Sequence, residues 1–193
     1  MLNNQNIFYN KKILIYGLGK SGLSAFKFLK KDNSIITYDD KIKNNTKKIT
    51  KIKFDYIIIS PGIDINKCSL SKFLKNNQKK IHTDLDIFYS HHKRNNKITI
   101  TGTNGKSTTA KILYDVLKDQ KIDARLVGNI GNPALLETKV TNKTVFVIEA
   151  SSYQLEYSKL FKSNISLILN ISPDHLERHK TIKKYVSAKF KLI

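Results

Sequence analysis

The chain has 193 residues, of which 40% are hydrophobic, and carries a formal net charge of +20 at pH 7. This length allows one large or two small domains, and the apolar fraction is sufficient for a packed core. No apolar run approaches the ~20 residues of a membrane span, the first residues lack the order of a signal peptide, and the single cysteine, Cys68, excludes an internal disulfide. These features favour a cytoplasmic protein without a membrane partner.

The positive charge comes almost entirely from lysine, since the arginines are Arg94, Arg125 and Arg178. Lysine occurs together with Asn and Ile, as in residues 44–49 and 75–81, and these three residue types share A/T-rich codons. Proteins that read nucleic acids favour arginine forks and stacking aromatics, which are not clustered here. We therefore interpret the charge as a solvated lysine surface with no nucleic-acid partner; a dedicated nucleic-acid site is the alternative.

The first part of the chain alternates short apolar runs with a helical pattern. Strands are predicted over residues 12–16, 34–38 and 55–60, and a helix over residues 21–29. Strands that are apolar throughout and alternate with helices indicate a parallel sheet covered on both faces. The polar residues 91–96 predict the boundary between a first domain, residues 1–94, and a second domain, residues 95–193.

A glycine-rich turn follows the first predicted strand. Residues 17–22 read Gly-Leu-Gly-Lys-Ser-Gly, and Asp39 and Asp40 close the next strand. This pattern is typical of a diphosphate bound at a helix N-terminus, with an acidic residue on the ribose. NAD, FAD and a UDP-sugar all carry a diphosphate, so the loop does not choose among them. Glycines that serve only the turn are the structural alternative.

A second α/β unit begins at residue 97. Strands are predicted over residues 97–101, 124–127, 144–148 and 165–170, with a helix over residues 106–117 and a last helix from about Ile182. The last helix is expected to be still running at Ile193, without a capping residue, as in a truncated domain. The expected fold is α/β, with two parallel-sheet domains in succession.

The segment Thr-Gly-Thr-Asn-Gly-Lys-Ser-Thr, residues 101–108, joins the first of these strands to the helix. Such a loop directs backbone N–H groups, the helix dipole and the charge of Lys106 toward one anion. The expected ligand is a nucleoside triphosphate, with the hydroxyl of Ser107 or Thr108 free to bind Mg²⁺. The glycines are closer together than in the usual G-x-x-x-x-G-K-[ST] loop, and a simple strand–turn–helix is the alternative.

Three further patterns follow strand ends. Glu149 comes directly after a Val-Phe-Val-Ile strand, where a carboxylate can hold Mg²⁺ opposite the phosphate loop. Residues 128–133 form a glycine- and asparagine-rich loop suited to close approach by a ligand. His175 and His179 have the spacing of zinc ligands, but no third ligand has matching spacing.

Taken in order, these motifs resemble the Mur ligases of peptidoglycan synthesis. The matching segments cover essentially the whole chain and are residues 17–22, 60–63, 101–108, 128–131, 149–155, 170–176 and 187–189. The resemblance implies a Rossmann-like domain that binds a UDP precursor, followed by the first part of a P-loop ATPase domain. It also implies a role in cell-wall biogenesis, and with it in cell shape, cell cycle and cell division.

Within this family, the motifs are most similar to those of the ligase that adds D-glutamate to UDP-N-acetylmuramoyl-L-alanine. In the implied reaction, ATP phosphorylates the carboxylate of the precursor to an acyl phosphate. The amine of D-glutamate then displaces phosphate to form an amide. The resemblance therefore implies ATP and Mg²⁺ as cofactors, and a monomer is expected.

The resemblance also implies roles for individual residues. The residues implied to bind ATP are Gly102, Thr103, Asn104, Gly105, Lys106, Ser107 and Thr108. Those implied to hold metal are Ser107, Glu149, His175 and, as a carbamylated lysine, Lys189. The implied catalytic residues are Lys106, His175 and Lys189. Those implied to bind the UDP precursor are Gly17, Leu18, Gly19, Lys20, Ser21, Asp39, Ser60, Asn129, Ser151 and His175.

The sequence departs from the family in two respects. The family commonly has a small residue and then arginine where this chain has Asp40 and Lys41, and lysine lacks the planar fork of arginine. The family also continues through the rest of the ATPase domain and a third domain that binds the amino acid. We therefore expect these 193 residues alone to be inactive.

Three alternatives remain open. The first is a non-catalytic module that binds the UDP precursor, and the second is a Mur ligase for another amino acid. The third, based on residues 17–22 and Asp39 alone, is an NAD(P)-dependent oxidoreductase.

Overall fold

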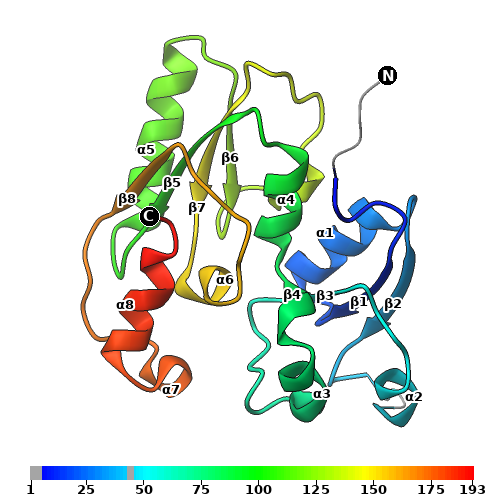
Figure 1. Ribbon diagram of the computed structural model, residues 1–193. Coiled ribbons are helices and arrows are strands. Elements are labelled where there is room, and N and C mark those ends of the chain that lie inside the picture. The colour runs from blue at the N-terminus through cyan, green and yellow to red at the C-terminus, as the bar shows by residue number, and fades with distance from the viewer. Residues whose placement is uncertain (1–5, 43–45) are drawn as a thin grey trace.

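The computed structural model describes residues 6–42 and 46–193. Residues 1–5 and 43–45, which the predicted first domain includes, lie outside the described residues. The described chain contains two four-stranded sheets, both entirely parallel and flanked by helices (Figure 1), which confirms the predicted α/β fold. Within the described ranges, no helix has both the length and the apolar character needed to span a bilayer.

The first unit contains the sheet with strand order β2-β1-β3-β4. The predicted strands are found with ends that shift by no more than one residue, whereas the two-residue β4 and the helices α2, α3 and α4 were not predicted. In chain order the elements are β1 (Lys12–Tyr16), α1 (Lys20–Leu29), β2 (Ser34–Tyr38), α2 (Thr46–Thr50), β3 (Tyr56–Ile59), α3 (Ser71–Asn76), β4 (Ile81–His82) and α4 (Asp84–His91).

The second unit contains the sheet with strand order β6-β7-β5-β8. Its strands were all predicted; the helices α6 and α7 were not. In chain order the elements are β5 (Asn96–Thr101), α5 (Lys106–Asp119), β6 (Ala124–Gly128), β7 (Val145–Glu149), α6 (Ser152–Glu156), β8 (Ile165–Ile168), α7 (Leu176–His179) and α8 (Ile182–Phe190). A short 3₁₀ turn, η2 (Ala134–Leu136), lies between β6 and β7.

The last helix ends earlier than predicted. α8 stops at Phe190, although the sequence pattern predicted helix up to Ile193. Leu192 turns inward and is only 6% exposed, and its carbonyl accepts a hydrogen bond from the hydroxyl of Ser166 at 3.0 Å. Burial of the leucine side chain and this contact with β8 draw the last residues out of the helical path.

One hydrophobic core joins the two units. It includes Ile13 and Ile15 of β1, Phe88 of α4 and Phe146 of β7. The rings of Phe88 and Phe146 meet edge-on, with centroids 4.8 Å apart. α4 lies between the two sheets (Figure 1) and contacts both α1 and α6. The two units are therefore packed against each other rather than separated by an open linker.

Lys97, at the start of β5, is a buried lysine without a carboxylate partner among the described residues; its side chain is 1% exposed. Its Nζ donates to the carbonyl of Asn95 and lies 5.5 Å from the ring centre of Tyr89. Burial lowers the pKa of Lys97 to about 8, because the apolar surroundings disfavour the ammonium ion.

This lowered pKa predicts a pH-dependent contribution to stability. Between pH 8 and about 9.5 the unfolded chain binds more protons at this lysine than the folded chain, so the free energy of unfolding rises with pH. Lys97→Met should raise the free energy of unfolding at pH 7 by about 1 kcal/mol and flatten part of this rise. Urea denaturation at pH 7, 8 and 9.5 measures both effects. The same dependence of the unfolding free energy on pH in the parent and in Lys97→Met would contradict the prediction. Lys189, whose pKa is also lowered, contributes equally in both proteins and does not affect the comparison.

Candidate active site at the junction of the two units

The loop between β5 and α5 has the backbone form of a phosphate-binding loop. Gly102 and Gly105 have φ angles of 154° and 80°, and Gly105 directly precedes the first residue of α5. The left-handed conformation of Gly105 suits a residue without a Cβ. Lys106 opens the helix, and its Nζ donates to the carbonyl of Thr103 at 2.7 Å. The positive end of α5 and the lysine charge are thus directed at the same loop.

Side chains from a neighbouring loop hold this phosphate loop in place. Asn170 accepts a hydrogen bond from the backbone N–H of Asn104 at 2.9 Å and donates to its carbonyl at 3.1 Å. The hydroxyl of Thr103 accepts from the backbone N–H of Ser172 at 3.0 Å and lies 3.0 Å from the hydroxyl of Tyr185. These contacts involve only protein groups, and they connect the phosphate loop to residues 170–172 and to α8.

Glu149 lies at the end of β7, with a side chain only 1% exposed. One carboxylate oxygen accepts from the hydroxyl of Ser107 at 2.7 Å, and the other accepts from the amide of Asn129 at 2.8 Å. No Lys or Arg forms an ion pair with Glu149 in the part of the chain that the structure describes. A buried carboxylate with only neutral partners, beside a hydroxyl oxygen, fits a hard divalent cation such as Mg²⁺.

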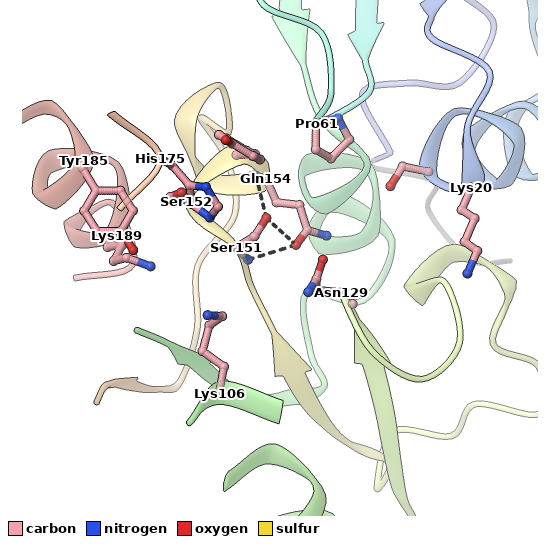
Figure 2. Close-up of a pocket in the computed structure, with 13 residues that line it drawn as sticks. Lys20, Pro61, Lys106, Asn129, Ser151, Ser152, Gln154, His175, Tyr185 and Lys189 are labelled. Carbon is pink, nitrogen blue, oxygen red and sulfur yellow. Dashed lines mark hydrogen bonds between the residues drawn. The ribbon is translucent and has the colours of Figure 1, made fainter. Parts of the chain in front are cut away.

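A cavity of about 390 Å³ opens between the two units. The first unit contributes Lys20, Ser21 and Pro61 to its wall, and Figure 2 shows Lys20 and Pro61 facing the second unit across it. Of the residues predicted to form the site, those that line the cavity are Lys20, Ser21, Lys106, Asn129, Ser151, His175 and Lys189. Residues from six separate predicted motifs are thus brought to one place.

The other predicted residues do not line this cavity. Glu149 and Ser107 are each connected to a lining residue. Glu149 accepts the hydrogen bond from Asn129, and Ser107 follows Lys106 in α5 and donates to Glu149. Thr108 is an exposed residue of the first turn of α5. The remaining predicted residues belong to the two glycine loops and their supports and are Gly17, Leu18, Gly19, Asp39, Ser60, Gly102, Thr103, Asn104 and Gly105.

Lys189 is the most deeply buried cation of the cavity wall, with 1% of its surface exposed. Its Nζ donates to the carbonyl of Gly102 at 2.8 Å and lies 4.6 Å from the ring centre of Tyr185. Burial, with a further contribution from the charge of Lys106, lowers the pKa of Lys189 to about 8. This lysine therefore has a larger neutral fraction near pH 7 than an exposed lysine.

His175 has a left-handed backbone with a φ of 52° at the start of α7. Its ring lies 4.8 Å from the ring of Tyr153, and its Nε2 lies 3.3 Å from a carboxylate oxygen of Asp174. His179 is buried and lies 3.1 Å from the hydroxyl of Ser152. Within the described residues there is no group of three or more His, Cys, Asp or Glu side chains that could hold a metal, so the zinc alternative gains no support.

In the first unit, several predicted residues shape the glycine loop rather than face the cavity. The hydroxyl of Ser60 donates to the carbonyl of Gly17 at 2.7 Å. The carboxylate of Asp39 accepts from the backbone N–H groups of Leu18 at 2.6 Å and Lys41 at 2.9 Å, and these two contacts hold the pKa of Asp39 below its usual value. Both side chains thus hold the loop that carries Lys20 and Ser21.

The sequence analysis gave no individual role to six residues of the cavity wall, namely Pro61, Gly128, Ser152, Tyr153, Gln154 and Tyr185; all but Tyr185 lie within motifs that it singled out. A signal existed for one of them. Ser151 and Gln154 form a capping box at the start of α6, and the spacing S-x-x-Q is readable in the sequence. Tyr185 has no such signal, because it reaches Thr103 only through the packing of α8 against the phosphate loop.

Comparisons with known proteins place the chain among proteins of one family. Residues 100–193 match the Mur ligase middle domain. The chain is 38% identical to the UDP-N-acetylmuramoylalanine–D-glutamate ligase of Rickettsia bellii across 96% of its own length. It is also 38% identical to the ligase of the same name from Clostridioides difficile, across 93% of its own length. In each case it covers 44% of the relative, so the chain spans less than half the length of these curated relatives.

Two solved structures share the fold. The UDP-N-acetylmuramate:L-alanyl-gamma-D-glutamyl-meso-diaminopimelate ligase from Neisseria meningitides matches with a TM-score of 0.58 at 15% identity, over 95% of this chain and 68% of that one. The UDP-N-acetylmuramate-alanine ligase from Thermotoga maritima matches with a TM-score of 0.51 at 21% identity, over 95% and 47% of the two chains. At these identities the likeness concerns the fold alone.

Proposed function

Because the chain belongs to the Mur ligase family, we propose that it forms the part of an ATP-dependent ligase that binds ATP and a UDP-linked precursor. The proposed reaction adds D-glutamate to UDP-N-acetylmuramoyl-L-alanine during peptidoglycan synthesis in the cytoplasm. The observation that carries the proposal is the shared cavity. In it a phosphate loop, a lysine of lowered pKa and the glycine loop of the other unit approach one another.

In this proposal, ATP occupies the loop of residues 102–105 at the start of α5. The ammonium of Lys106 and the loop N–H groups bind the β- and γ-phosphates, as the direction of the helix dipole favours. Ser107 and Glu149 would hold Mg²⁺, and His175 and Lys189 would hold a second ion at the opposite wall. When bound, these ions offset the negative charge of the phosphates.

The precursor lies across the junction of the two units. Lys20 and Ser21 follow the glycine loop and face its diphosphate, while Asn129 and Ser151 face its muramoyl-alanine end. The carboxylate oxygen of the precursor attacks the γ-phosphorus, and ADP leaves. The amine nitrogen of D-glutamate then attacks the acyl carbon, loses a proton and displaces phosphate. The protein's contribution is to hold these groups in line and away from water.

The environment of Lys189 supports a further chemical step. A neutral amine can attack CO₂ and lose a proton to become a carbamate, and the resulting anionic oxygens are hard ligands suited to Mg²⁺. The lowered pKa of Lys189 increases the neutral fraction that this step needs. Carbamylation of Lys189 is therefore part of the proposal, and an added mass of one CO₂ at this residue in native mass spectrometry would support it.

Calorimetric titration of the chain tests the binding half of the proposal. We expect saturable heat with Mg·ATP and with UDP-N-acetylmuramoyl-L-alanine. A flat titration with the precursor would reject precursor binding by this chain. Saturable heat with NADH, and none with the precursor, would favour the oxidoreductase alternative.

ADP release tests the reaction. We expect release that depends on D-glutamate from a protein with the full length of the curated relatives, and none from these 193 residues alone. Release with a different amino acid would favour a Mur ligase of other specificity. Precursor binding without turnover in either protein would favour the non-catalytic binding module.

A further inference from the structure

Asp86 is a carboxylate that the site described above does not use. It lies in the first turn of α4 and is fully buried, with 0% of its surface exposed. Burial opposes ionisation, but hydrogen bonds from His82, Ser158 and neighbouring backbone groups hold the pKa of Asp86 below its usual value. The residue is therefore a buried negative charge, and such a charge is stable only where donors surround it.

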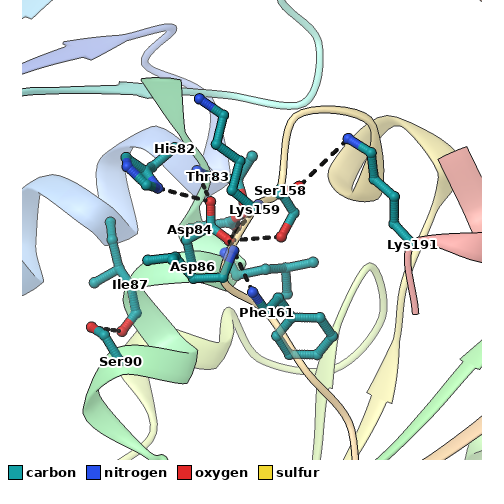
Figure 3. Close-up of polar contacts among 12 residues, drawn as sticks. His82, Thr83, Asp84, Asp86, Ile87, Ser90, Ser158, Lys159, Phe161 and Lys191 are labelled. Atoms are coloured by element: carbon teal, nitrogen blue, oxygen red, sulfur yellow. Dashed lines mark hydrogen bonds and ion pairs between the residues drawn. The ribbon is translucent and has the colours of Figure 1, made fainter. Parts of the chain in front are cut away.

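The two oxygens of Asp86 face different units (Figure 3). Oδ2 stays within the first unit, where it accepts from the backbone N–H of Thr83 at 3.1 Å and lies 3.3 Å from Nδ1 of His82. Oδ1 contacts only the second unit. It accepts from the hydroxyl of Ser158 at 2.7 Å and from the backbone N–H groups of the next three residues, Lys159, Leu160 and Phe161, at 2.9, 2.8 and 3.1 Å.

Three successive N–H groups that converge on one oxygen form a concave anion-binding surface. We call residues 158–161 the anchor loop; it lies between α6 and β8. Other residues hold the same loop. Nζ of Lys159 donates to the carbonyl of Gln78 in the first unit, and Nζ of Lys191, just beyond α8, lies 3.5 Å from the carbonyl of Ser158. The anchor loop is thus tied to the first unit and to the segment that follows α8.

The elements joined by Asp86 also carry the two halves of the cavity. α4 contacts α1, and the first residues of α1, Lys20 and Ser21, line the first-unit side. The anchor loop begins two residues after the end of α6, and α6 begins directly after Ser151 on the second-unit side. A change in the distance between α4 and the anchor loop therefore changes the distance between the two walls.

We propose that Asp86 is a positioning residue that fixes the two halves of the cavity relative to each other, so that a ligand spanning both units is bound in a single geometry. Only the identity of that ligand rests on the proposed function. The positioning role itself rests on the division of the two carboxylate oxygens between the units.

Asp86→Asn tests this role with little change in size. An asparagine has one acceptor oxygen, so either the contacts of Oδ2 or the four donors to Oδ1 lose their acceptor. Ser158→Ala is a milder variant, because it removes one donor and leaves the charge and the backbone contacts. Asp55→Asn is the matched control, since Asp55 accepts the backbone N–H of Lys12 at 2.8 Å within the first unit.

Distance measurements between spin labels report the placement of the units directly. Labels on Lys27→Cys in α1 and Lys118→Cys in α5, in a Cys68→Ser background, place one label on each unit. We expect one narrow distance distribution for the parent protein and for Asp55→Asn. Asp86→Asn should broaden or shift it, and Ser158→Ala should do so to a smaller extent. If Asp86→Asn does not fold, Ser158→Ala alone decides.

Titration calorimetry then separates ligands that span the units from ligands that do not. Asp86→Asn should weaken binding of UDP-N-acetylmuramoyl-L-alanine about tenfold, because small misplacements of binding groups are costly. Binding of a non-hydrolysable ATP analogue, which uses the second unit, should change less than about twofold.

The two readouts keep the proposals apart. Unchanged narrow distances in both Asp86→Asn and Ser158→Ala would overturn the positioning role, whatever the ligand data show. Changed distances in a protein that never binds the precursor would overturn the proposed function and leave the positioning role standing. Equal weakening of precursor binding and nucleotide binding in Asp86→Asn would also overturn the positioning role, because a general loss of stability weakens the binding of both ligands.

Discussion

Lys106→Ala is expected to lower the affinity of the chain for Mg·ATP by about 100-fold. Lys106 stands at the start of α5, and its Nζ donates to a loop carbonyl and has no carboxylate partner in the described part of the chain. Its charge is therefore available to a polyphosphate. Hydrogen bonds from the ammonium group to phosphate oxygens are stronger than those from the neutral N–H groups of the loop. Titration calorimetry with a non-hydrolysable ATP analogue measures the loss.

Lys111→Ala is the matched control for this measurement. Lys111 lies on the same helix, but its ammonium is exposed and pairs with Asp115 one turn later. Such pairs contribute little, so nucleotide affinity should stay within about twofold of the parent. Equal affinities in Lys106→Ala and the parent would mean that residues 102–106 are only a strand–turn–helix, the alternative reading of this segment.

Gly22→Ala is expected to cost about 3–5 kcal/mol of folding free energy. A Cβ at Gly22 would lie 1.8 Å from the carbonyl oxygen of Gly17 and 2.8 Å from the hydroxyl of Ser60. The first of these is backbone and cannot swing aside. α1 would have to move away from β1, because their close approach depends on the absence of a side chain at Gly22.

Gly19→Ala provides the control within the same loop. A Cβ at Gly19 meets no atom within 4 Å, and its φ of −71° suits any residue. The free energy of unfolding of Gly19→Ala should stay within about 0.5 kcal/mol of that of the parent. Urea denaturation of both variants measures the difference, and two equal values would show that α1 adapts to the added methyl group at low cost.

Much of the fold was predictable because its strands are continuous apolar runs. Residues 13–16 and 146–149 are buried on both faces of their sheets, and a run of apolar residues bounded by turn residues predicts such strands from the local sequence alone. The phosphate loop and the glycine loop were also predictable, because each depends on residues within one strand–turn–helix. The roles of the individual site residues remain predictions.

The anchor loop could not be predicted in this way. Asp86 and Ser158 lie in separate units, and nothing in the residues around either one specifies the other. A buried carboxylate bound by backbone N–H groups leaves no trace in the donor sequence, since every residue except proline has that donor. β4 was missed for a related reason: its two residues show no period, and its pairing with β3 supplies the strand.

The orientation of Asp39 also lay beyond the sequence. An acidic residue at the end of β2 predicts a contact with a ribose, which stays a prediction; the structure adds that the side chain accepts two backbone N–H groups of its own unit. Both uses require a carboxylate at the same place. Only the three-dimensional arrangement shows which donors are nearest.

The division of Asp86 between the units has a consequence for synthesis on the ribosome. All four strands of the first sheet are complete by His82, so this sheet can close before the second sheet exists. At about 5–20 residues per second, the anchor loop is made several seconds later. During that interval water must solvate the carboxylate that later becomes buried. The nascent first unit therefore carries a hydrated negative charge on the face that will dock, and the four donors of residues 158–161 replace this water when the second unit packs against it.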